Sequence, residues 1–508
     1  MCAARRHGAG KQILEDIERQ PMSYGRLILA ALVLGKRLAE DTQRGETVGV
    51  LLPNVAGLAA TIFGLNAYGR VPALLNFSAG AKNLSSALRT GLIATIITSR
   101  RFIATAKLQD VIDALAATQG RPGHKTRIIY LEDLRKTIGT KARITGLMKS
   151  KFAARVHARH ALGPDDPAMV LFTSGTEGEP KGVVLSNANI VANSSQIFAH
   201  AAGMFTPADT VLNPLPMFHS FGLTAATFMP LLNGLKVVLY PSPLHYKQVP
   251  KLICATRATI MFATDTFAQG YARMASDGDL DSIRYVVCGA EKVKATTRKL
   301  WHKAGSVLLE GYGATECAPV IACNTPRAGR DGTVGPLLPG IEVRLEPVAG
   351  IAEGGRLLVK GPNVMSGYML SKSPGKVIPP DDGWHDTGDI VTIDDDGLMA
   401  ISGRAKRFAK LGGEMISLAA VETMVAALWP DWNHVVLSAP DPKKGEQLVL
   451  LTDNPTAQRG ELHSAAKAAG YPELWTPRKI LSVAEIPILG SGKVDFQAAN
   501  ELACRAAK

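Results

Sequence analysis

Short apolar runs rich in Val, Ile and Leu recur along the chain as far as Gly313, and longer stretches with helical spacing lie between them. The helical stretches include 24–42 and 54–70. Parallel strands need long crossover connections, which are usually helices, so this alternation predicts an α/β fold with parallel-rich sheets. The predicted strands are 47–53, 94–99, 127–132, 168–174, 236–241, 258–264, 283–291 and 306–313.

The pattern changes after Gly335, where short alternating runs and tight turns predict an antiparallel module that ends in a DDDG hairpin. The runs of this module are 341–347, 355–361 and 389–403. Strands and helices alternate again from Arg404 onward, and they are 418–429, 434–440, 447–453 and 459–469. We expect a large domain over residues 1–403 and a small, mobile α+β domain over residues 404–508.

Composition and charge narrow the classes of partner. With 46% apolar residues the chain can bury a core in each domain, which excludes a disordered protein. Lys and Arg number 57 against 44 Asp and Glu, which favours anionic partners such as nucleotides, acidic proteins or acidic lipids. A basic surface that is merely solvated is the alternative. The chain has no long Lys/Arg block and no zinc-finger spacing, so we expect no nucleic-acid partner.

The cysteines and the apolar stretches indicate the cellular compartment of the protein. The six cysteines form no CxxC pair, and several lie in apolar runs, as reduced core thiols do in a reducing compartment. The basic first residues lack the apolar core of a signal peptide. The most apolar stretch, 221–235, is shorter than the roughly 20 residues that span a bilayer. We expect a cytoplasmic protein, and peripheral contact with the inner face of the membrane stays open.

The loop TSGTEGEPKG, residues 173–182, follows the apolar run AMVLF and raises the first question of chemistry. Successive backbone N–H groups in such a loop can form a concave anion site, and Lys181 adds a full positive charge. The spacing is not that of the GxxxxGK[ST] phosphate loop, because Lys181 is followed by glycine. A plain turn between a strand and a helix is the alternative.

Four further segments carry candidate polar groups. GYGATECAP (311–319) offers a hydroxyl and a carboxylate just beyond a strand, and WHDTGDI (384–390) places Asp389 in a tight turn. GRAKRFAKLGGEMISL (403–418) gathers four basic residues at the expected domain junction, and LGSGKVDF (489–496) presents a lysine from a glycine loop. The four junction residues are Arg404, Lys406, Arg407 and Lys410. Each segment alone could be structural, but their joint occurrence in this order points to a nucleotide site.

These ordered motifs, over nearly the whole chain, resemble those of the adenylate-forming superfamily. This superfamily includes acyl-CoA synthetases, the adenylation domains of peptide synthetases and luciferase. More narrowly, segments such as LPMFHSFGL, RYVVCGAEK and LGSGKVDF resemble the acyl-acyl carrier protein synthetase half of the bacterial bifunctional 2-acylglycerophosphoethanolamine acyltransferase/acyl-ACP synthetase family. The resemblance implies a large domain that binds ATP and an acyl chain, and a small domain that carries a hinge and a catalytic lysine.

The resemblance also implies roles for individual residues. The loop residues that would cradle the β- and γ-phosphates of ATP are Thr173, Ser174, Gly175, Thr176, Gly178 and Lys181. The residues that would border the adenine are Gly289, Ala290, Glu291 and Tyr312. Thr315 would face the α-phosphate, Glu316 would bind Mg²⁺, and Asp389 with Arg404 would hold the ribose. Glu177 departs from the family, which has a second threonine or serine there, and it adds negative charge beside the phosphates.

The remaining implied roles concern the acid and the thiol. Lys493 would be the catalytic lysine, Lys406 the hinge and Gly413 part of the tunnel for the pantetheine arm. Phe218, His219 and Phe221 would line the acyl pocket, where we favour orientation over acid–base chemistry for the histidine. From the residues alone, a buried core histidine and a glycine that ends a helix are the alternatives.

The implied reaction has two steps. A fatty acid reacts with ATP to give an acyl-adenylate, and the acyl group is then transferred to the phosphopantetheine thiol of acyl carrier protein. Coenzyme A is the alternative acceptor, which would make the enzyme a long-chain fatty acid–CoA ligase. A nucleotide- or acyl-binding protein without catalysis is a second alternative, and a peptide-synthetase adenylation domain is a weaker third.

Overall fold

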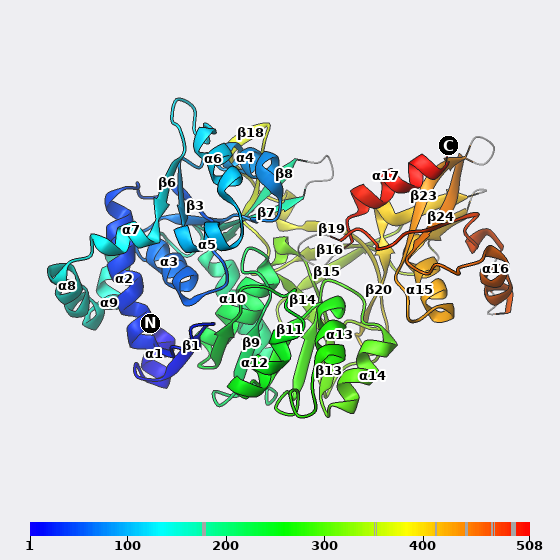
Figure 1. Ribbon diagram of the computed structural model, residues 1–508, viewed down its shortest axis with the longest axis horizontal. Coiled ribbons are helices and arrows are strands. Elements are labelled where there is room, and N and C mark those ends of the chain that lie inside the picture. Colours follow the sequence, from blue (N-terminus) through cyan, green and yellow to red (C-terminus); the bar gives the residue numbers. More distant parts are fainter. Residues whose placement is uncertain are drawn as a thin grey trace. The chain divides into compact units, whose positions relative to one another are not determined.

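The computed structural model (Figure 1) describes residues 1–507 apart from 175–178, 350, 352, 412–413, 442–444, 469–470, 472 and 489–493. It does not describe the side chains at 141–143, 174, 406, 410, 414–415, 445, 504, 506 and 507. The chain divides into two compact units, and unit 1 comprises Met1–Arg327, Leu338–Ile341 and Lys360–His385. Unit 2 comprises Ala328–Leu337, Glu342–Val359 and Asp386–Lys508. Unit 2 therefore groups much of the antiparallel module with the C-terminal residues, and the functional boundary at residue 404 stays a prediction.

Unit 1 contains two eight-stranded sheets. The first has the order β14-β13-β12-β11-β9-β10-β1-β2, and its six inner strands are parallel, with an antiparallel strand at each edge. Its strands are β1 (Gln12–Glu15), β2 (Met22–Ser23), β9 (Thr210–Asn213), β10 (Lys236–Leu239), β11 (Ile260–Ala263), β12 (Tyr285–Cys288), β13 (Val307–Gly313) and β14 (Val320–Cys323).

The second sheet has the order β18-β17-β8-β7-β4-β3-β5-β6. The half from β7 to β6 is parallel and the half from β18 to β7 is antiparallel. Its strands are β3 (Thr47–Val50), β4 (Val71–Leu74), β5 (Thr95–Thr98), β6 (Arg127–Tyr130), β7 (Pro167–Ser174), β8 (Pro180–Ser186), β17 (Gly367–Leu370) and β18 (Ser373–Ile378).

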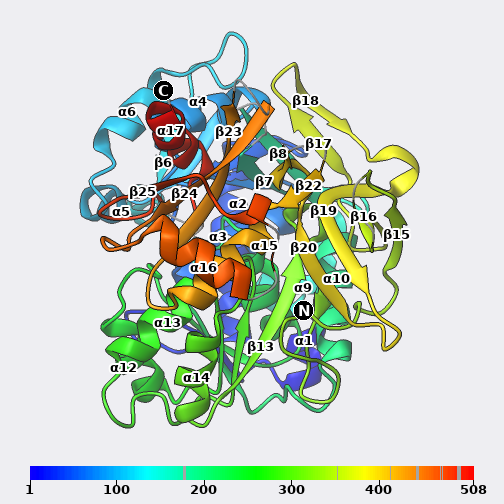
Figure 2. The same ribbon diagram turned by 90° about the vertical axis from the view of Figure 1, so that its right-hand side faces the viewer.

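Helices cover these sheets, and α12, α13 and α14 lie along the first of them (Figures 1 and 2). The helices that precede β7 are α1 (Cys2–His7), α2 (Tyr24–Glu40), α3 (Ala56–Ala67), α4 (Gly80–Thr90), α5 (Arg100–Thr105), α6 (Gln109–Ala117), α7 (Leu131–Lys136), α8 (Thr140–Lys151) and α9 (Ala153–His160). The later helices of unit 1 are α10 (Asn187–His200), the π-helix η1 (Phe221–Phe228), α11 (Met229–Leu232), α12 (Gln248–Thr256), α13 (Asp265–Met274), α14 (Ala295–Lys303) and the 3-10 helices η2 (Thr315–Cys317) and η3 (Asp381–Gly383).

The main core of unit 1 lies between the two sheets. The alternation of side chains along β3 illustrates how the sequence builds this core. Val48 and Val50 belong to it, whereas Leu51, which follows the strand, belongs to a second core on the other face of the sheet. Leu14 and Val237 contribute to the main core from the first sheet. Strands buried on both faces read as continuous apolar runs, which is why the sequence marks them clearly.

A pair of glycines sets the approach of α2 and α3. A Cβ atom at Gly35 would lie 2.3 Å from the carbonyl oxygen of Gly64, and one at Gly64 would lie 2.8 Å from that of Ala31. Neither distance is compatible with a side chain, so the two helices touch backbone to backbone at this point. Larger residues here would separate the helices that cover the second sheet.

Unit 2 contains three antiparallel or mixed sheets. The first has the order β15-β16-β19-β20, the second pairs β21 with β22, and the third has the order β23-β24-β25. The strands are β15 (Glu342–Glu346), β16 (Gly355–Lys360), β19 (His385–Ile393), β20 (Met399–Arg404), β21 (Phe408–Leu411), β22 (Glu414–Ser417), β23 (His434–Asp441), β24 (Gly445–Thr452) and β25 (Lys479–Ser482). The helices are η4 (Ala405–Arg407), α15 (Leu418–Leu428), α16 (Arg459–Ala468), η5 (Glu473–Trp475) and α17 (Phe496–Ala507).

The structure confirms the predicted α/β class and each of the eight strands predicted before Gly313. The hairpin predicted at the DDDG turn is β19–β20. The segment 140–165, which is rich in Lys, Arg and Ala and lacks β-branched runs, forms α8 and α9. The apolar stretch 221–235 folds into η1 and α11, and no helix in the described residues is long and apolar enough to cross a membrane.

Candidate active site

The glycine-rich loop joins two strands. Strands β7 and β8 pair antiparallel with Thr173 opposite Lys181 and Ser174 opposite Pro180, so the loop closes a hairpin. The alternative of a turn between a strand and a helix is therefore wrong. The interior of the loop, Gly175, Thr176, Glu177 and Gly178, lies outside the described residues, and the side chain of Ser174 is also not described.

The turn after β13 positions Thr315 and Glu316. They lie on η2, and the turn is tight because a Cβ atom at Gly313 would lie 2.1 Å from the carbonyl oxygen of Pro319. The Ala314 N–H donates to that same oxygen at 2.9 Å. Glycine is thus required two residues before Thr315, the predicted α-phosphate contact, because any side chain would break the turn.

A distant segment holds Glu316 in place. The Tyr368 hydroxyl, on β17, donates a hydrogen bond of 2.6 Å to Oε1 of Glu316, and the Met365 N–H donates to its carbonyl oxygen at 2.7 Å. Asn363 Nδ2 donates to the Cys317 carbonyl oxygen at 2.8 Å. The backbone and the carboxylate of Glu316 are therefore both fixed by the segment that leads into β17.

Lys181 and Ser220 complete this arrangement. The Lys181 Nζ atom lies 5.4 Å from the centre of the Tyr368 ring, in a cation–π contact. The Ser220 hydroxyl donates to the Thr315 hydroxyl oxygen at 3.4 Å. We define the Glu316 cluster as Lys181, Ser220, Thr315, Glu316 and Tyr368. Within the described residues, neither Lys181 nor Glu316 forms an ion pair, so both charges are available for a ligand.

The residues predicted to border the adenine differ in their contacts and conformation. Glu291 Oε2 accepts hydrogen bonds from the N–H and the hydroxyl of Thr266, at 3.0 and 2.9 Å, and so caps the first turn of α13. Its carboxylate is therefore used to stabilise the helix. Ala290 adopts a left-handed conformation with a φ of 71°, and Tyr312 is buried.

The predicted acyl-pocket residues surround the start of η1. Phe218 is buried and packs edge-on against Phe77, with ring centres 5.1 Å apart. The ring of His219 lies 4.7 Å from that of Phe218. A Cβ atom at Gly289 would lie 3.2 Å from Cζ of Phe221, so the structure brings a predicted adenine contact and a predicted acyl contact together.

In unit 2, Asp389 and Arg404 face each other across the β19–β20 hairpin. They are directly opposed in register, and Arg404 Nε lies 3.1 Å from Asp389 Oδ1. The Asp389 side chain is 8% exposed and that of Arg404 is 70% exposed. The two residues assigned to the ribose therefore form a pair whose carboxylate is buried and whose guanidinium is in water.

The remaining predicted residues of unit 2 are only partly described. Lys406 lies on η4, but its side chain is not described, and Gly413 and Lys493 lie outside the described residues. Arg407, from the predicted basic junction, pairs with Glu422 at 2.7 Å and donates to the Val436 carbonyl oxygen at 2.8 Å. That guanidinium therefore has a structural role.

Two buried thiols in unit 1 are excluded as nucleophiles. Burial raises the pKa of Cys317 well above its ordinary value, and the negative charge of the adjacent Glu316 raises it further. Burial likewise raises the pKa of Cys288. Both thiols therefore stay protonated at neutral pH. In the described part of the chain, no group of three or more His, Cys, Asp or Glu side chains could hold a metal ion.

The sequence reasoning missed Tyr368 and Ser220. Neither residue lies in a glycine-rich or charged motif, and Tyr368 reads as an ordinary apolar position of a short strand. The antiparallel pairing of β17 with β8 brings Tyr368 opposite Val183 and beside Lys181. Only this long-range pairing marks Tyr368 as part of the site.

The fold and the Glu316 cluster define a two-unit α/β protein with polar groups gathered beside the β7–β8 hairpin. The chain belongs to the AMP-binding enzyme family, whose model matches residues 3–369. This result confirms the predicted superfamily and the ligase class of enzyme to which the motifs pointed.

Similar proteins cover almost the whole chain. Feruloyl-CoA synthase from an Amycolatopsis species is 28% identical over 506 residues, which are 97% of this chain and 94% of that protein. The long-chain-fatty-acid–CoA ligase of Haemophilus influenzae is 24% identical over 89% of this chain and 84% of that protein. The crystal structure of ATP-bound MatB from Rhodopseudomonas palustris superposes with a TM-score of 0.81 at 26% identity, covering 100% of this chain and 99% of that one.

Proposed function

We propose that this protein is an AMP-forming ligase that activates a long-chain fatty acid with ATP and transfers the acyl group to the thiol of coenzyme A. The observation that carries the proposal is the Glu316 cluster, in which Tyr368 contacts both Lys181 and Glu316, and Ser220 contacts Thr315, in a chain that belongs to the AMP-binding enzyme family. These are the charges and hydroxyls that a triphosphate and its metal need.

In the first step, an oxygen of the fatty acid carboxylate attacks the α-phosphorus of ATP, and the bond to pyrophosphate breaks. Two anions must meet, so positive charge and N–H donors around the phosphates lower the barrier. Lys181 and the hairpin loop would hold the β- and γ-phosphates, and Thr315 would donate to the α-phosphate. Lys493 would bridge the carboxylate and the α-phosphate.

The site suits magnesium. A carboxylate such as Glu316 is a hard oxygen ligand, and Mg²⁺ usually takes one or two carboxylates and fills its other positions with phosphate oxygens and water. Bound there, Mg²⁺ would neutralise negative charge that develops on the phosphates. The hydrogen bond from Tyr368 fixes the orientation of the Glu316 carboxylate toward this task.

In the second step, the thiol attacks the carbonyl carbon of the acyl-adenylate and AMP leaves. We propose that residues 404–508 rotate about Lys406 between the two steps, so that Lys493 withdraws and the Gly413 side faces the thiol. Asp389 and Arg404 would hold the ribose hydroxyls. Phe218, His219 and Phe221 would line the acyl chain.

Coenzyme A is the acceptor with more support. The similar proteins named above include a feruloyl-CoA synthase and a long-chain-fatty-acid–CoA ligase. The acidic carrier protein, favoured by the narrower resemblance to acyl-ACP synthetases and by the net positive charge, is the second candidate. The basic junction residues would be the contact for that acidic protein, but one of them, Arg407, is already engaged with Glu422.

A panel of acids and both acceptors tests the proposal. Purified protein is given ATP, magnesium and fatty acids of increasing chain length or hydroxycinnamic acids, with either coenzyme A or acyl carrier protein, and thioester is measured. We expect thioester with long-chain fatty acids and coenzyme A. Thioester only with the carrier protein, or only with hydroxycinnamic acids, would correct the acceptor or the acid respectively.

The Lys493→Ala variant separates catalysis from binding. We expect it to lose adenylate formation by about a hundredfold or more while its affinity for ATP is kept, because the lysine acts on the reacting groups. In the wild-type protein, binding of ATP with no pyrophosphate exchange into ATP, with or without an acid, would favour the alternative of a binding protein without catalysis.

A further inference from the structure

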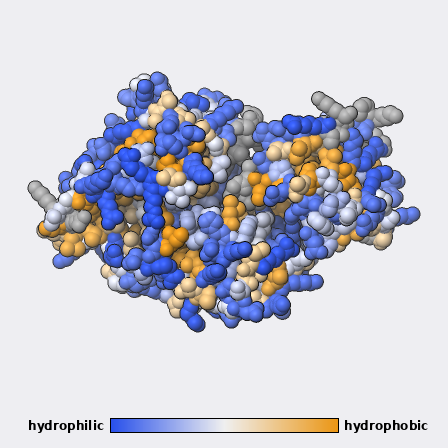
Figure 3. Space-filling model, in the orientation of Figure 1, coloured by the Kyte–Doolittle hydropathy of each residue, from blue (hydrophilic) through white to orange (hydrophobic). Residues whose placement is uncertain are grey.

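Helix α8 and the residue after it carry the four most exposed large apolar side chains in the described part of the chain. They are Ile144, Leu147, Met148 and Phe152, with exposed fractions of 57%, 55%, 65% and 56%. Positions spaced by three, four and eight residues share one side of a helix, so these side chains form one stripe. Figure 3 shows hydrophobic colour at the left end of the molecule, where Figure 1 places α8.

This stripe is not needed for folding, because the opposite side of α8 and α9 already packs against unit 1. A Cβ atom at Gly146 would lie 2.2 Å from Cγ2 of Val33 on α2, which shows how closely the two helices approach. Ala153 is buried in a small core with Leu32 and Tyr68. The outward apolar side chains therefore have no packing role in the described structure.

The stripe lies in a strongly basic segment. Residues 140–160 include six Lys or Arg residues and no Asp or Glu. Among them, Lys151 is exposed on the side of the apolar stripe, and Arg155 lies over the Phe152 ring at 5.6 Å. Burial lowers the pKa of Lys149, and the nearby positive charges of Lys36 and Arg159 lower it further. Positive charge is therefore concentrated in this segment.

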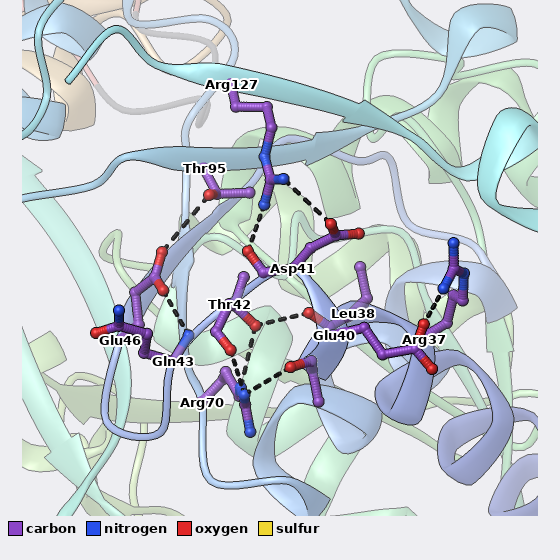
Figure 4. Close-up of polar contacts among 11 residues, drawn as sticks. Arg37, Leu38, Glu40, Asp41, Thr42, Gln43, Glu46, Arg70, Thr95 and Arg127 are labelled. Carbon is purple, nitrogen blue, oxygen red and sulfur yellow. Dashed lines mark hydrogen bonds and ion pairs between the residues drawn. The ribbon is translucent and has the colours of Figure 1, made fainter.

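Acidic side chains on the neighbouring helices do not offset this charge. At the end of α2, Glu40 pairs with Arg37, and Asp41 lies 3.2 Å from the Arg127 guanidinium (Figure 4). On α7, Asp133 pairs with Arg100 at 2.5 Å. These three carboxylates are thus already matched by cations of their own. The other acidic side chain of α7, Glu132, accepts hydrogen bonds from the Ser99 hydroxyl and from the N–H groups of Arg100 and Arg101.

We propose that this surface docks on an anionic lipid bilayer. We define the α8 face as Ile144, Leu147, Met148, Lys151, Phe152 and Arg155. Apolar side chains of a helix that lies on a membrane enter the headgroup region, and Lys and Arg contact the lipid phosphates while their aliphatic parts stay in the apolar layer. A second copy of this chain would bring two basic surfaces together, so charge complementarity favours the lipid.

Vesicle binding tests the proposal directly. The full-length protein is sedimented with phosphatidylcholine vesicles that contain about one third phosphatidylglycerol, and with vesicles of phosphatidylcholine alone. We expect binding to the anionic vesicles that weakens as salt rises, and much weaker binding to the neutral ones. The assay needs neither ATP nor acid, so its result is independent of the proposed ligase activity.

Two variants of the α8 face address its apolar and its charged parts. We expect Ile144→Ser/Leu147→Ser/Met148→Ser to lower the partition coefficient by about 30-fold or more. We expect Lys151→Glu/Arg155→Glu to lower it by at least about 25-fold, because each positive charge removed accounts for about fivefold and the two negative charges added lower it further. Circular dichroism and the thermal midpoint check that these surface changes leave the fold intact.

Matched controls lie elsewhere on unit 1. Val191→Ser/Leu244→Ser/Met274→Ser replaces three apolar side chains of about half exposure, and Lys299→Glu/Lys303→Glu reverses two exposed charges on α14. Neither control should change vesicle binding.

Three results would overturn the proposal. The first is wild-type protein that does not sediment with anionic vesicles, and the second is an apolar variant that binds them like wild type. The third is a dimer, or a complex with acidic carrier protein, that depends on the α8 face while vesicle binding does not. In that case a protein partner occupies the face.

Discussion

The Glu316 cluster of unit 1 and the Asp389–Arg404 pair of unit 2 are both assigned to one nucleotide, yet they are built differently. Glu316 is fixed by hydrogen bonds to its carboxylate and its backbone from the segment around β17. Asp389 is buried, whereas its partner Arg404 is 70% exposed. From this difference we propose that Glu316 stabilises the transition state and that the Asp389–Arg404 pair adds affinity for the nucleotide.

Glu316→Gln should produce the largest effect on turnover. The amide keeps the shape and an acceptor for Tyr368 but removes the charge that would bind magnesium, so we expect kcat of adenylate formation to fall by about 100- to 1,000-fold. Steady-state kinetics with a fatty acid checks this. Glu18→Gln is the control, because Glu18 forms only an exposed pair with Arg101. An unchanged kcat would remove Glu316 from the site.

Asp209→Asn alters the scaffold of unit 1 without altering a residue of the proposed site, so it separates effects on stability from effects on catalysis. Asp209 precedes β9, at the amino end of the first sheet, whereas η2 follows the carboxyl end of β13 in the same parallel set. Asp209 accepts hydrogen bonds from Thr259 at 2.7 Å and from Arg284 at 2.6 Å. We expect the variant to lower the free energy of unfolding by about 2–3 kcal/mol at neutral pH, with kcat nearly unchanged.

The same residue predicts a pH dependence. Burial would raise the pKa of Asp209, but the hydrogen bonds from Thr259, Thr206 and Arg284 outweigh it and hold the pKa below its ordinary value of 3.8. A lowered native pKa contributes stability that is present above the unfolded pKa and is lost as pH falls through the native pKa. Denaturant unfolding of wild type and variant should therefore differ most above about pH 5 and converge in stronger acid. A constant difference across that range would contradict this account, and Asp277→Asn, at an exposed position, is the control.

Asp389→Asn should have a smaller effect, and mainly on binding. Loss of the buried charged acceptor for the ribose hydroxyls should raise KM for ATP by about tenfold and change kcat less. The control is Asp386→Asn, whose exposed carboxylate lies 3.7 Å from Arg356. If kcat falls as far as in Glu316→Gln while KM stays constant, the proposed division between the two units is wrong.

Tyr368→Phe should give the smallest effect and defines a positioning role. The ring contact with Lys181 is kept, but the hydrogen bond to Glu316 is lost, so we expect kcat to fall by about fivefold. The dependence of the rate on magnesium concentration should shift, which a purely packing role would not cause. Tyr285→Phe is the control, because its ring also contacts a cation, Arg284 at 5.0 Å. Wild-type magnesium dependence in Tyr368→Phe would refute the role.

The sequence predicted the local parts of this structure well. The hairpin at the DDDG turn was visible in the sequence, but pairing counted from that turn would place Asp389 opposite Gly403. A register shift between Ile390 and Val391 places Asp389 opposite Arg404 instead, and the sequence did not predict that shift. The motif around Glu316 was visible, because glycine and a short turn after an apolar strand are local features. Strands β3, β7 and β12 were visible as continuous apolar runs.

The contacts between distant segments could not be predicted. Tyr368 reaches Glu316 only because β17 returns from beyond residue 360 to pair with β8, and no local pattern encodes that pairing. The use of Glu291 as a cap for α13 depends equally on tertiary structure, since Thr266 lies on another element. The interior of the hairpin loop, Gly413 and Lys493 stay predictions.

Exchange of labelled pyrophosphate into ATP, measured with and without a long-chain fatty acid, tests the central claim most directly. It reports formation of the acyl-adenylate without any thiol acceptor, so it isolates the step assigned to the Glu316 cluster. We predict fast exchange that requires both the acid and magnesium in the wild-type protein, and a rate at least about a hundredfold lower in Glu316→Gln. Exchange at the wild-type rate in that variant would contradict the assignment.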